Sequence, residues 1–468
     1  MIVQRQFHAT LLVLAAVVLG LPTPHFAVEA SIDVEDANVD LSQDQIDIFI
    51  EEATSYLVRV CHTKEQDPDH EGKFTYIAYL DEELPLDFTD EEVAEEDLDQ
   101  TYNLLRHSGT IYSLCLSYKR TADPKVLKAI ERSMEFVQDR ALGPVPVASH
   151  DDDERYEYDV GEKPSYLPDL LAVWETKRVV PNLSNPPKAE LGGAGLTLLA
   201  MVNLEQILPG TFELTDLRKL ANFIQFMQKA DGSFYSQYLP FDGGKDNHNP
   251  SLFYPGEACL ALLYLVSIET DEHYKAQWIQ TATRALLYLE RYRRDMEINE
   301  IEPDHWALIA TSKLLPLLNP EGSDYGLIYR HGVRVAARMV LGISKETLLE
   351  DDGCQTCTTG DGNTCATAAR LEGLIAALTF IDEDELIIPE TDRRGREVNV
   401  YDRVLFFVRL GVQFLVESQE HDTSNNMQGG VPAKTEEDPN EVRIDYVQHS
   451  MSAIIMYEMT VISESESS

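Results

Sequence analysis

Positively charged residues are scarce in this chain. Its 468 residues include 38 Lys and Arg against 81 Asp and Glu, so the formal net charge is −43. A surface this acidic repels phosphate backbones and anionic lipids, which argues against nucleic-acid binding and against attachment through a polybasic segment. The hydrophobic share of 44% is nevertheless enough for a packed core, and it argues against wholesale disorder.

Long hydrophobic runs are absent beyond the N-terminus. The apolar stretch 9–21, followed by the small residues Val28 and Ala30, has the pattern of a cleaved secretory signal. No other stretch reaches the ~18 apolar residues that a membrane span needs. We therefore predict a signal peptide over residues 1–30, an acidic linker over 31–42, and a mature protein that is secreted or lumenal and not held in the membrane.

Cysteine is also sparse. Of the six cysteines, three fall close together, at positions Cys354, Cys357 and Cys365. No adjacent fourth ligand completes a zinc site, and an oxidising compartment favours disulfides, so we expect a local disulfide among these three. The sequon at Asn182 is a candidate glycosylation site.

Two kinds of helical stretch alternate along the rest of the chain. One kind has apolar residues at i, i+3 and i+4 with charges on the opposite face, as in helices with one side in water. The other kind opens with polar, aromatic and glycine residues and is then apolar around most of its circumference, as in buried helices. The first kind spans 43–60, 123–141, 214–230, 271–292, 324–341 and 400–419, and the second spans 102–118, 190–204, 252–266, 304–318, 365–381 and 443–459.

This alternation predicts an all-α fold, an (α/α)6 toroid of six helical hairpins in which the apolar helices form the inner ring. Turns that combine glycine with an aromatic residue, such as Gln228–Phe234, follow outer helices and are expected to form short β-hairpins or loops over one end. One domain over residues 43–462, with an acidic tail at 463–468, replaces the roughly three domains that length alone suggests.

Inner helices that all begin at the same end bring their polar openings into one bowl. Helix N-termini add unpaired N–H groups and a partial positive charge, which favour anionic or hydroxyl-rich ligands. Each polar side chain there has a structural alternative as a paired ion, a helix cap or a packed core residue, so their joint placement is the stronger signal. The openings carry Tyr102, Asn103, Arg106, His107, Glu190, Tyr254, Glu257, Asp304, His305, Trp306, Arg370, Glu372, Arg443, Asp445, Tyr446 and His449.

Two kinds of sugar chemistry suit such a bowl. Paired carboxylates, Glu257 with Asp304, Glu372 or Asp445, would hydrolyse a glycosidic bond. Alternatively, histidine or tyrosine side chains would abstract the proton next to the carboxylate of a uronic acid while an arginine neutralises that carboxylate. The second chemistry is that of polysaccharide lyases and C5-epimerases.

Two further functions are compatible with the sequence. The turn Gln228–Phe234 resembles the Q-x-G-x-W/F turns of terpene cyclases, another group of α/α toroids, although the inner helices lack an Asp-rich motif for prenyl chemistry. A non-catalytic glycan-binding or scaffold protein would also use the same bowl.

Two segments resemble D-glucuronyl C5-epimerases. The segment Arg443-Ile-Asp-Tyr446-Val-Gln-His449 is similar to the R-x-D-Y-H segment of that family, and Tyr102-Asn-Leu-Leu-Arg-His107 is similar to its Y-D-L-R-H segment. The resemblance implies a carbohydrate-active toroid and, by position, a catalytic role for Tyr446.

We therefore expect an enzyme that epimerises or eliminates at a uronic acid of a glycan, with a hydrolase using Glu257 and Asp304 as the alternative. Positive side chains in the bowl of an otherwise acidic protein suit an anionic sugar. Neutral glycans remain alternative substrates. No cofactor or metal is predicted, nothing supports a structural calcium ion, and the oligomeric state stays open. The acid/base candidates are Tyr446, His449 and His107, the carboxylate anchors are Arg106, Arg443 and Arg370, and the other substrate-binding candidates are Tyr102, Asn103, Tyr254, His305, Trp306, Glu372 and Asp445.

Overall fold

The computed structural model describes residues 41–67, 69–80, 102–148, 165–179, 186–248, 250–340, 364–383, 399–424, 426–435 and 439–463. The predicted signal peptide, Asn182, Cys354 and Cys357 lie outside these ranges, as do most of the linker and of the acidic tail. Within them, every helix is too short or too polar to cross a membrane.

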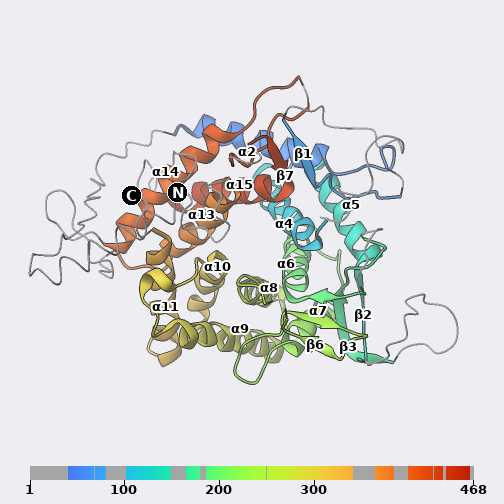
Figure 1. Cartoon of the computed structure of the whole chain (residues 1–468), viewed down its shortest axis with the longest axis vertical. Helices are drawn as coiled ribbons and strands as arrows, with labels where there is room; N and C mark the ends of the chain where they lie inside the picture. The colour runs from blue at the N-terminus through green and yellow to red at the C-terminus, as the bar shows by residue number, and fades with distance from the viewer. Residues whose placement is uncertain are drawn as a thin grey trace, which may run out of the picture.

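Two concentric rings of helices make up the described part of the chain. The inner helices are α4 (Leu104–Thr121), α6 (Leu191–Ile207), α8 (Tyr254–Ile268), α10 (His305–Leu314), α13 (Thr364–Leu378) and α15 (Ile444–Tyr457). Each contacts the next in this order, and α15 closes the ring against α4 (Figure 1). The outer helices are α2 (Gln43–Arg59), α5 (Pro124–Arg140), α7 (Leu214–Phe226), α9 (Glu272–Arg293), α11 (Ser323–Val340) and α14 (Val400–Ser418). The predicted (α/α)6 toroid is confirmed.

Local sequence determines where the helices begin and end. Asp123 and Asp271 cap α5 and α9, because their carboxylates accept hydrogen bonds from backbone N–H groups of the first turn. In α6, every residue from Leu191 to Leu204 is buried, as expected of an inner helix. Helix α10 is shorter than predicted and continues as the 3-10 helix η4 (Leu315–Leu317), because Pro316 has no N–H group to extend an α-helix. A second 3-10 helix, η3 (Ile298–Glu300), lies between α9 and α10, and a π-helix, η5 (Glu458–Ile462), follows α15.

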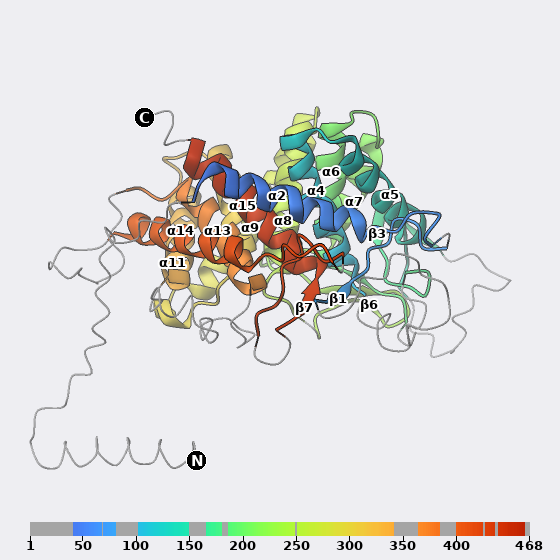
Figure 2. The ribbon, with the colours of Figure 1, turned by 90° about the horizontal axis from the view of Figure 1, so that it is seen from above.

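Short strands gather at one end of the rings (Figure 2). Strand β1 (Ile77–Tyr79) pairs antiparallel with β7 (Glu441–Arg443), and β2 (Leu142–Pro146) pairs antiparallel with β3 (Tyr166–Val173). Strands β4 (Ala189–Glu190), β5 (Gln237–Leu239) and β6 (Gly244–Asp246) form an antiparallel sheet in that order. Because β4 and β7 lead directly into α6 and α15, their pairing also positions the first turns of these inner helices.

The glycine turns repeat a packing arrangement around the ring. Gly72, Gly232 and Gly429 have φ values of +86°, +98° and +87°, which side chains other than glycine rarely adopt. A Cβ at any of the three would also collide with a backbone carbonyl of an outer helix, α5, α9 and α2 respectively. Each turn therefore packs directly against an outer helix, and only glycine permits this approach.

Candidate functional site

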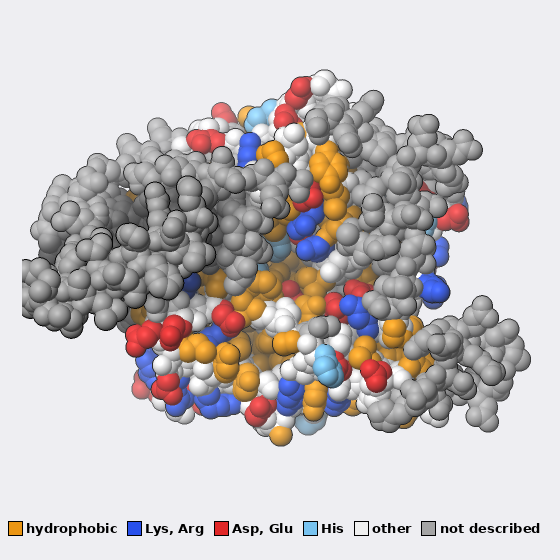
Figure 3. All heavy atoms as spheres, in the orientation of Figure 1, with side chains coloured by type: hydrophobic (Ala, Val, Ile, Leu, Met, Phe, Trp, Pro, Cys, Tyr) orange, Lys and Arg blue, Asp and Glu red, His pale blue; other side chains and the backbone are white. Residues whose placement is uncertain are grey.

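A pocket of about 290 Å³ lies where the inner helices begin. Figure 3 shows the corresponding face hollowed near its centre, with hydrophobic and basic side chains beside the hollow. All the inner helices contribute to it, so the structure does bring their openings together. The lining residues are Leu105, Arg106, Leu196, Phe253, Glu257, Pro303, His305, Trp306, Met339, Cys365, Ala366, Ala369, Arg370, Arg443, Asp445, Tyr446, Gln448 and His449.

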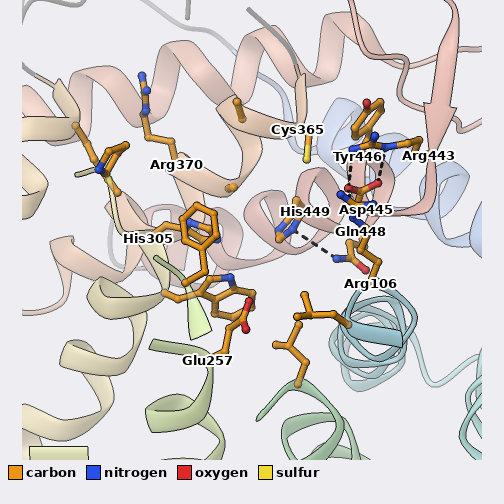
Figure 4. Close-up of a pocket in the computed structure, with 18 residues that line it drawn as sticks. Arg106, Glu257, His305, Cys365, Arg370, Arg443, Asp445, Tyr446, Gln448 and His449 are labelled. Carbon is orange, nitrogen blue, oxygen red and sulfur yellow. Dashed lines mark hydrogen bonds and ion pairs between the residues drawn. The ribbon is translucent and has the colours of Figure 1, made fainter. Parts of the chain in front are cut away.

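Two histidines from different inner helices meet in this pocket. His305 is the first residue of α10, and His449 lies in the second turn of α15. Their ring centroids are 5.9 Å apart and the ring planes meet at 82° (Figure 4). Trp306 lies beside both rings, at centroid distances of 5.2 Å from His305 and 6.3 Å from His449. Gly373 of α13 allows this packing, because a Cβ there would come within 2.8 Å of the backbone of His305.

The two imidazoles have opposite pKa shifts. Burial, with a smaller contribution from His449, holds the pKa of His305 well below its ordinary value, so this ring is neutral at neutral pH. Its Nε2 atom is buried and has no hydrogen-bond partner among the described residues. Burial alone would also lower the pKa of His449, but the charge and hydrogen bond of Glu372, followed by the charge of Asp445, raise it.

Glu372 of α13 lies behind His449 and orients its ring. One carboxylate oxygen accepts a hydrogen bond from His449 Nδ1 at 2.7 Å, and the other accepts from the hydroxyl of Ser452. Sequence reasoning named Glu372 but missed Ser452, which lies one helical turn after His449. It also missed Gln448, which lines the pocket and accepts a hydrogen bond at 2.7 Å from Thr110 of α4.

Arginines on two neighbouring inner-helix openings share one carboxylate. Asp445 accepts hydrogen bonds from Arg443 at 3.1 and 3.0 Å, and it pairs with Arg106 at 2.9 Å. The Arg443 guanidinium lies 4.4 Å from the ring centroid of Tyr446, whose hydroxyl donates to Glu441 at 2.8 Å. Burial and Glu441 outweigh Arg443 and raise the pKa of Tyr446, so its phenol stays protonated at neutral pH. Two guanidinium ions and one aspartate of this group line the pocket, and Glu441, 3.8 Å from Arg443, supplies a second carboxylate outside the lining.

Two further ionisable side chains complete the lining. Burial and the nearby charge of Arg338 lower the pKa of Arg370 to about 10, which leaves the guanidinium charged at neutral pH. Glu257 is 2% exposed, and its Oε2 atom has no hydrogen-bond partner in the described part of the chain. Burial first, and then the charges of Asp304 and Glu190, raise the pKa of Glu257 well above its ordinary value, so it is a neutral acid.

His107 and Tyr102 do not lie in this pocket, contrary to prediction. His107 is fully buried against α5, where its Nε2 donates to the Ser133 carbonyl at 2.9 Å and its Nδ1 accepts from the Tyr102 hydroxyl. Burial lowers the pKa of His107 to about 4. Both side chains hold α4 against its outer helix. Asn103 is the N-cap of α4 and accepts a hydrogen bond from the backbone of Leu105 at 2.7 Å.

Asp304, Tyr254 and Glu190 are not among the lining residues either. Asp304 is fully buried and accepts a hydrogen bond from Arg293 of α9 at 2.9 Å. Its other oxygen caps α10 by accepting from the Ala307 N–H at 3.0 Å, so both oxygens have structural partners. The hydroxyl of Tyr254 donates to Glu190 at 2.9 Å, and Tyr254 lines a second pocket.

Cys365 lies in the first turn of α13 and is a free thiol within the described residues. Its two candidate partners lie outside these residues, so the disulfide stays a prediction. Its side chain lines the pocket. Burial raises its pKa above the ordinary range, so it stays a protonated thiol. The predicted inner-helix stretch 365–381 begins at this cysteine, and α13 begins one residue earlier.

One cluster in the described residues could hold a metal ion. His305, Glu372 and His449 offer ligand atoms that all lie within 4.8 Å of one another. Each oxygen of Glu372 already accepts a hydrogen bond, one from His449 and one from Ser452, so this carboxylate acts as the partner of His449. We therefore interpret the cluster as an acid/base group.

This interpretation predicts that metal removal has no effect on stability. Dialysis against EDTA, or addition of ZnCl2 or MnCl2, should leave the melting temperature unchanged in thermal unfolding followed by circular dichroism. A ligand that binds only the folded state raises that temperature. A rise on adding metal that disappears in Glu372→Gln would instead identify a metal centre.

Neither a protein-family model nor a curated protein sequence matches this chain. Several solved structures, however, superpose on this chain over most of its length. The GH76A alpha-1,6-mannanase from Salegentibacter sp. HEL1_6 superposes with a TM-score of 0.51 at 11% identity, covering 89% of this chain and 100% of that one. D-mannose isomerase gives 0.51 at 12% identity, covering 89% and 97%, and an unsaturated glucuronyl hydrolase specific for heparin gives 0.51 at 10%, covering 90% and 98%. All three are (α/α)6 toroids, and at this identity the similarity establishes the fold.

Proposed function

We propose that the chain is a carbohydrate-active enzyme that transfers a proton at a carbon atom of a sugar, as epimerases and lyases do. The observation that supports this most strongly is the histidine pair in the pocket, one ring neutral and the other backed by a carboxylate. Proton transfer at carbon needs a base and an acid within reach of the same substrate atom or its neighbours, each with a suitable pKa. The toroid fold shared with a mannanase, an isomerase and a glucuronyl hydrolase supports a sugar substrate.

The roles follow from the two environments. His305 lines the pocket, is neutral and has no hydrogen-bond partner for its Nε2 among the described residues, so we assign it as the base. Once its ring turns this buried atom toward the sugar, His305 takes the proton from the carbon and becomes an imidazolium ion. His449 is held by Glu372 and is more readily protonated, so it returns a proton to the carbon from the other side, which completes an epimerisation. In an elimination, His449 instead protonates the departing oxygen as the new C=C bond forms. Tyr446 stays a protonated phenol whose hydroxyl donates to Glu441, so its oxygen binds substrate as an acceptor.

The charge of the lining favours a uronic acid. Arg106, Arg370 and Arg443 line the pocket, while Glu257 is protonated and Asp445 is shared between two of the arginines. Neutralising the sugar carboxylate makes the adjacent C–H more acidic. The pocket is therefore positive inside a protein whose formal charge is −43. A signal peptide over 1–30 would place this enzyme in the secretory pathway, where such glycans are made or degraded.

Glycoside hydrolysis is the second candidate, and Glu257 is the side chain that favours it. Its buried, protonated carboxyl group suits a general acid. The partner carboxylate that the sequence suggested, Asp304, is bound to Arg293 and is not among the lining residues. Proton transfer at carbon therefore accounts for more of the pocket than hydrolysis does.

Incubation with a panel of uronic-acid polysaccharides tests the proposal. We expect either absorbance from unsaturated uronate, with one new reducing end for each bond cleaved, or a changed ratio of C5 epimers by NMR without cleavage. Reducing ends that the wild type releases without unsaturated uronate, and that Glu257→Gln does not release, would support the hydrolase instead. Glycan binding without any turnover would identify a binding protein.

The pH dependence of kcat/KM should reflect the two histidines. Because the mechanism needs His449 protonated and its pKa is raised, activity should persist above the ordinary histidine pKa of 6.5 and fall as pH rises further. On the acidic side, kcat/KM should begin to fall only below pH 6.5, because His305 must be neutral to act as the base and its pKa is lowered. Glu372→Gln removes the charge that raises the pKa of His449 and should move the alkaline limb to lower pH. Ser452→Ala keeps that charge and should leave the limb in place; equal profiles for all three proteins would contradict these roles.

A further inference from the structure

A second pocket, of about 300 Å³, lies directly beside the first. The start of α8 forms the wall between them, because Phe253 and Glu257 line the first pocket while Tyr254 lines the second. The segment before α10 continues the wall, with Pro303 facing the first pocket and Glu302 the second. The two pockets thus have the start of α8 and the segment before α10 as a common wall.

Aromatic rings and polar groups share the lining of the second pocket. Tyr288 and Tyr292 project from successive turns of α9 with nearly parallel rings, 8° apart in plane and 6.3 Å between centroids. Tyr292 is 55% exposed, so its ring is accessible to a ligand. Polar side chains, Asn247 and Ser251 among them, line the same pocket. Flat rings beside hydrogen-bonding groups match a sugar ring, whose C–H face is apolar and whose rim carries hydroxyl groups.

The opposite wall is the turn at 229–235, which is held rigidly in place. Arg284 of α9 donates to the carbonyl groups of Lys229 and Ala230 at 3.1 and 3.0 Å, and Arg291 donates to that of Asp231 at 2.7 Å. In Figure 1, α8 and α9, which contribute residues to this pocket, lie side by side. The pocket is therefore formed before any ligand arrives, which reduces the entropic cost of binding.

We propose that this second pocket is a sugar-binding subsite, so that the substrate is an oligosaccharide or polysaccharide of more than two units that extends from the first pocket into the second. The proposal rests on the proposed function for the sugar in the first pocket. It also gives a role to the glycine turn at 229–235, which the histidine chemistry does not use.

Binding of oligosaccharides of increasing length tests the subsite. The probes are two series of defined length, alternating glucuronic acid and N-acetylglucosamine, and α-1,6-linked mannose, measured by titration calorimetry on the inactive His305→Gln variant. In at least one series, a tetrasaccharide should bind about tenfold more tightly than a disaccharide, because it adds contacts with the tyrosine pair. Tyr292→Ala should remove most of this gain, and Tyr292→Phe, which keeps the ring, should retain it.

Tyr325→Ala is the matched control. Tyr325 and Tyr329 form a similar parallel pair on α11, with centroids 6.4 Å apart, yet neither lines either pocket. Affinity that does not increase with length in either series, or an increase that Tyr292→Ala leaves intact, would overturn the subsite. Length-dependent binding without turnover by the wild type would support the subsite and reject the proposed function. Turnover without length-dependent binding would support the proposed function and reject the subsite.

Discussion

Replacing either pocket histidine by glutamine, His305→Gln or His449→Gln, should lower kcat by a factor of about 10²–10⁴, the range typical of a lost general acid or base. Glutamine keeps a polar side chain of similar length but cannot take up or release a proton at neutral pH. The fold should survive, because His305 Nε2 makes no hydrogen bond to the described residues. Steady-state kinetics with far-UV circular dichroism measures both effects.

His107→Gln provides the matched control for this prediction. It too is a histidine in the opening of an inner helix, but its ring nitrogens hold Tyr102 and the Ser133 carbonyl away from the pocket. The variant should lose stability and keep its kcat at temperatures where it is folded. A loss of kcat as large as that of His305→Gln would contradict the assignment of the active site to the His305–His449 pair.

Removing the buried carboxylate in Asp304→Ala should lower the free energy of unfolding by about 3–5 kcal/mol, because it leaves the Arg293 charge buried without its partner. Arg293 is 1% exposed, so water cannot replace the lost carboxylate. The substitution also removes the N-cap of α10, the helix that begins with His305. Urea unfolding followed by circular dichroism measures the loss.

Two variants separate this structural role from a catalytic one. Asp304→Asn keeps an oxygen for the helix cap but removes the charge, and it should still destabilise the protein. Glu302→Gln changes a half-exposed carboxylate 3.8 Å from the same arginine, and it should alter the free energy of unfolding by less than about 0.5 kcal/mol. An Asp304→Asn protein with full stability and no turnover would make Asp304 a catalytic residue, as the hydrolase interpretation requires.

The ring architecture could be predicted because it depends on hydrophobic periodicity, which is local. Outer helices bury one face, inner helices bury nearly all of theirs, and the alternation of the two kinds requires two concentric rings. The convergence of the inner openings followed from the same alternation. Individual boundaries also had local causes, as Pro316 shows for the end of α10.

The direction of each side chain within the ring could not be predicted from the same pattern. An inner helix is apolar on every side, so its sequence does not distinguish the face toward the ring centre from the face toward the outer helix. His107 and His449 therefore looked equivalent, although one packs against α5 and the other lines the pocket. Likewise, Asp304 is paired by Arg293 of the preceding outer helix, a contact that no local spacing in the sequence marks.

Proton transfer at a sugar carbon is tested most directly by incubating the enzyme with a uronic-acid glycan in D2O and examining the recovered sugar by NMR. We expect deuterium at C5 or an unsaturated C4=C5 product with the wild type and with His107→Gln, and neither with His305→Gln. Cleaved glycan that has neither deuterium at C5 nor a C4=C5 double bond, produced by the wild type and lost in Glu257→Gln, would contradict proton transfer and identify the pocket as that of a glycoside hydrolase.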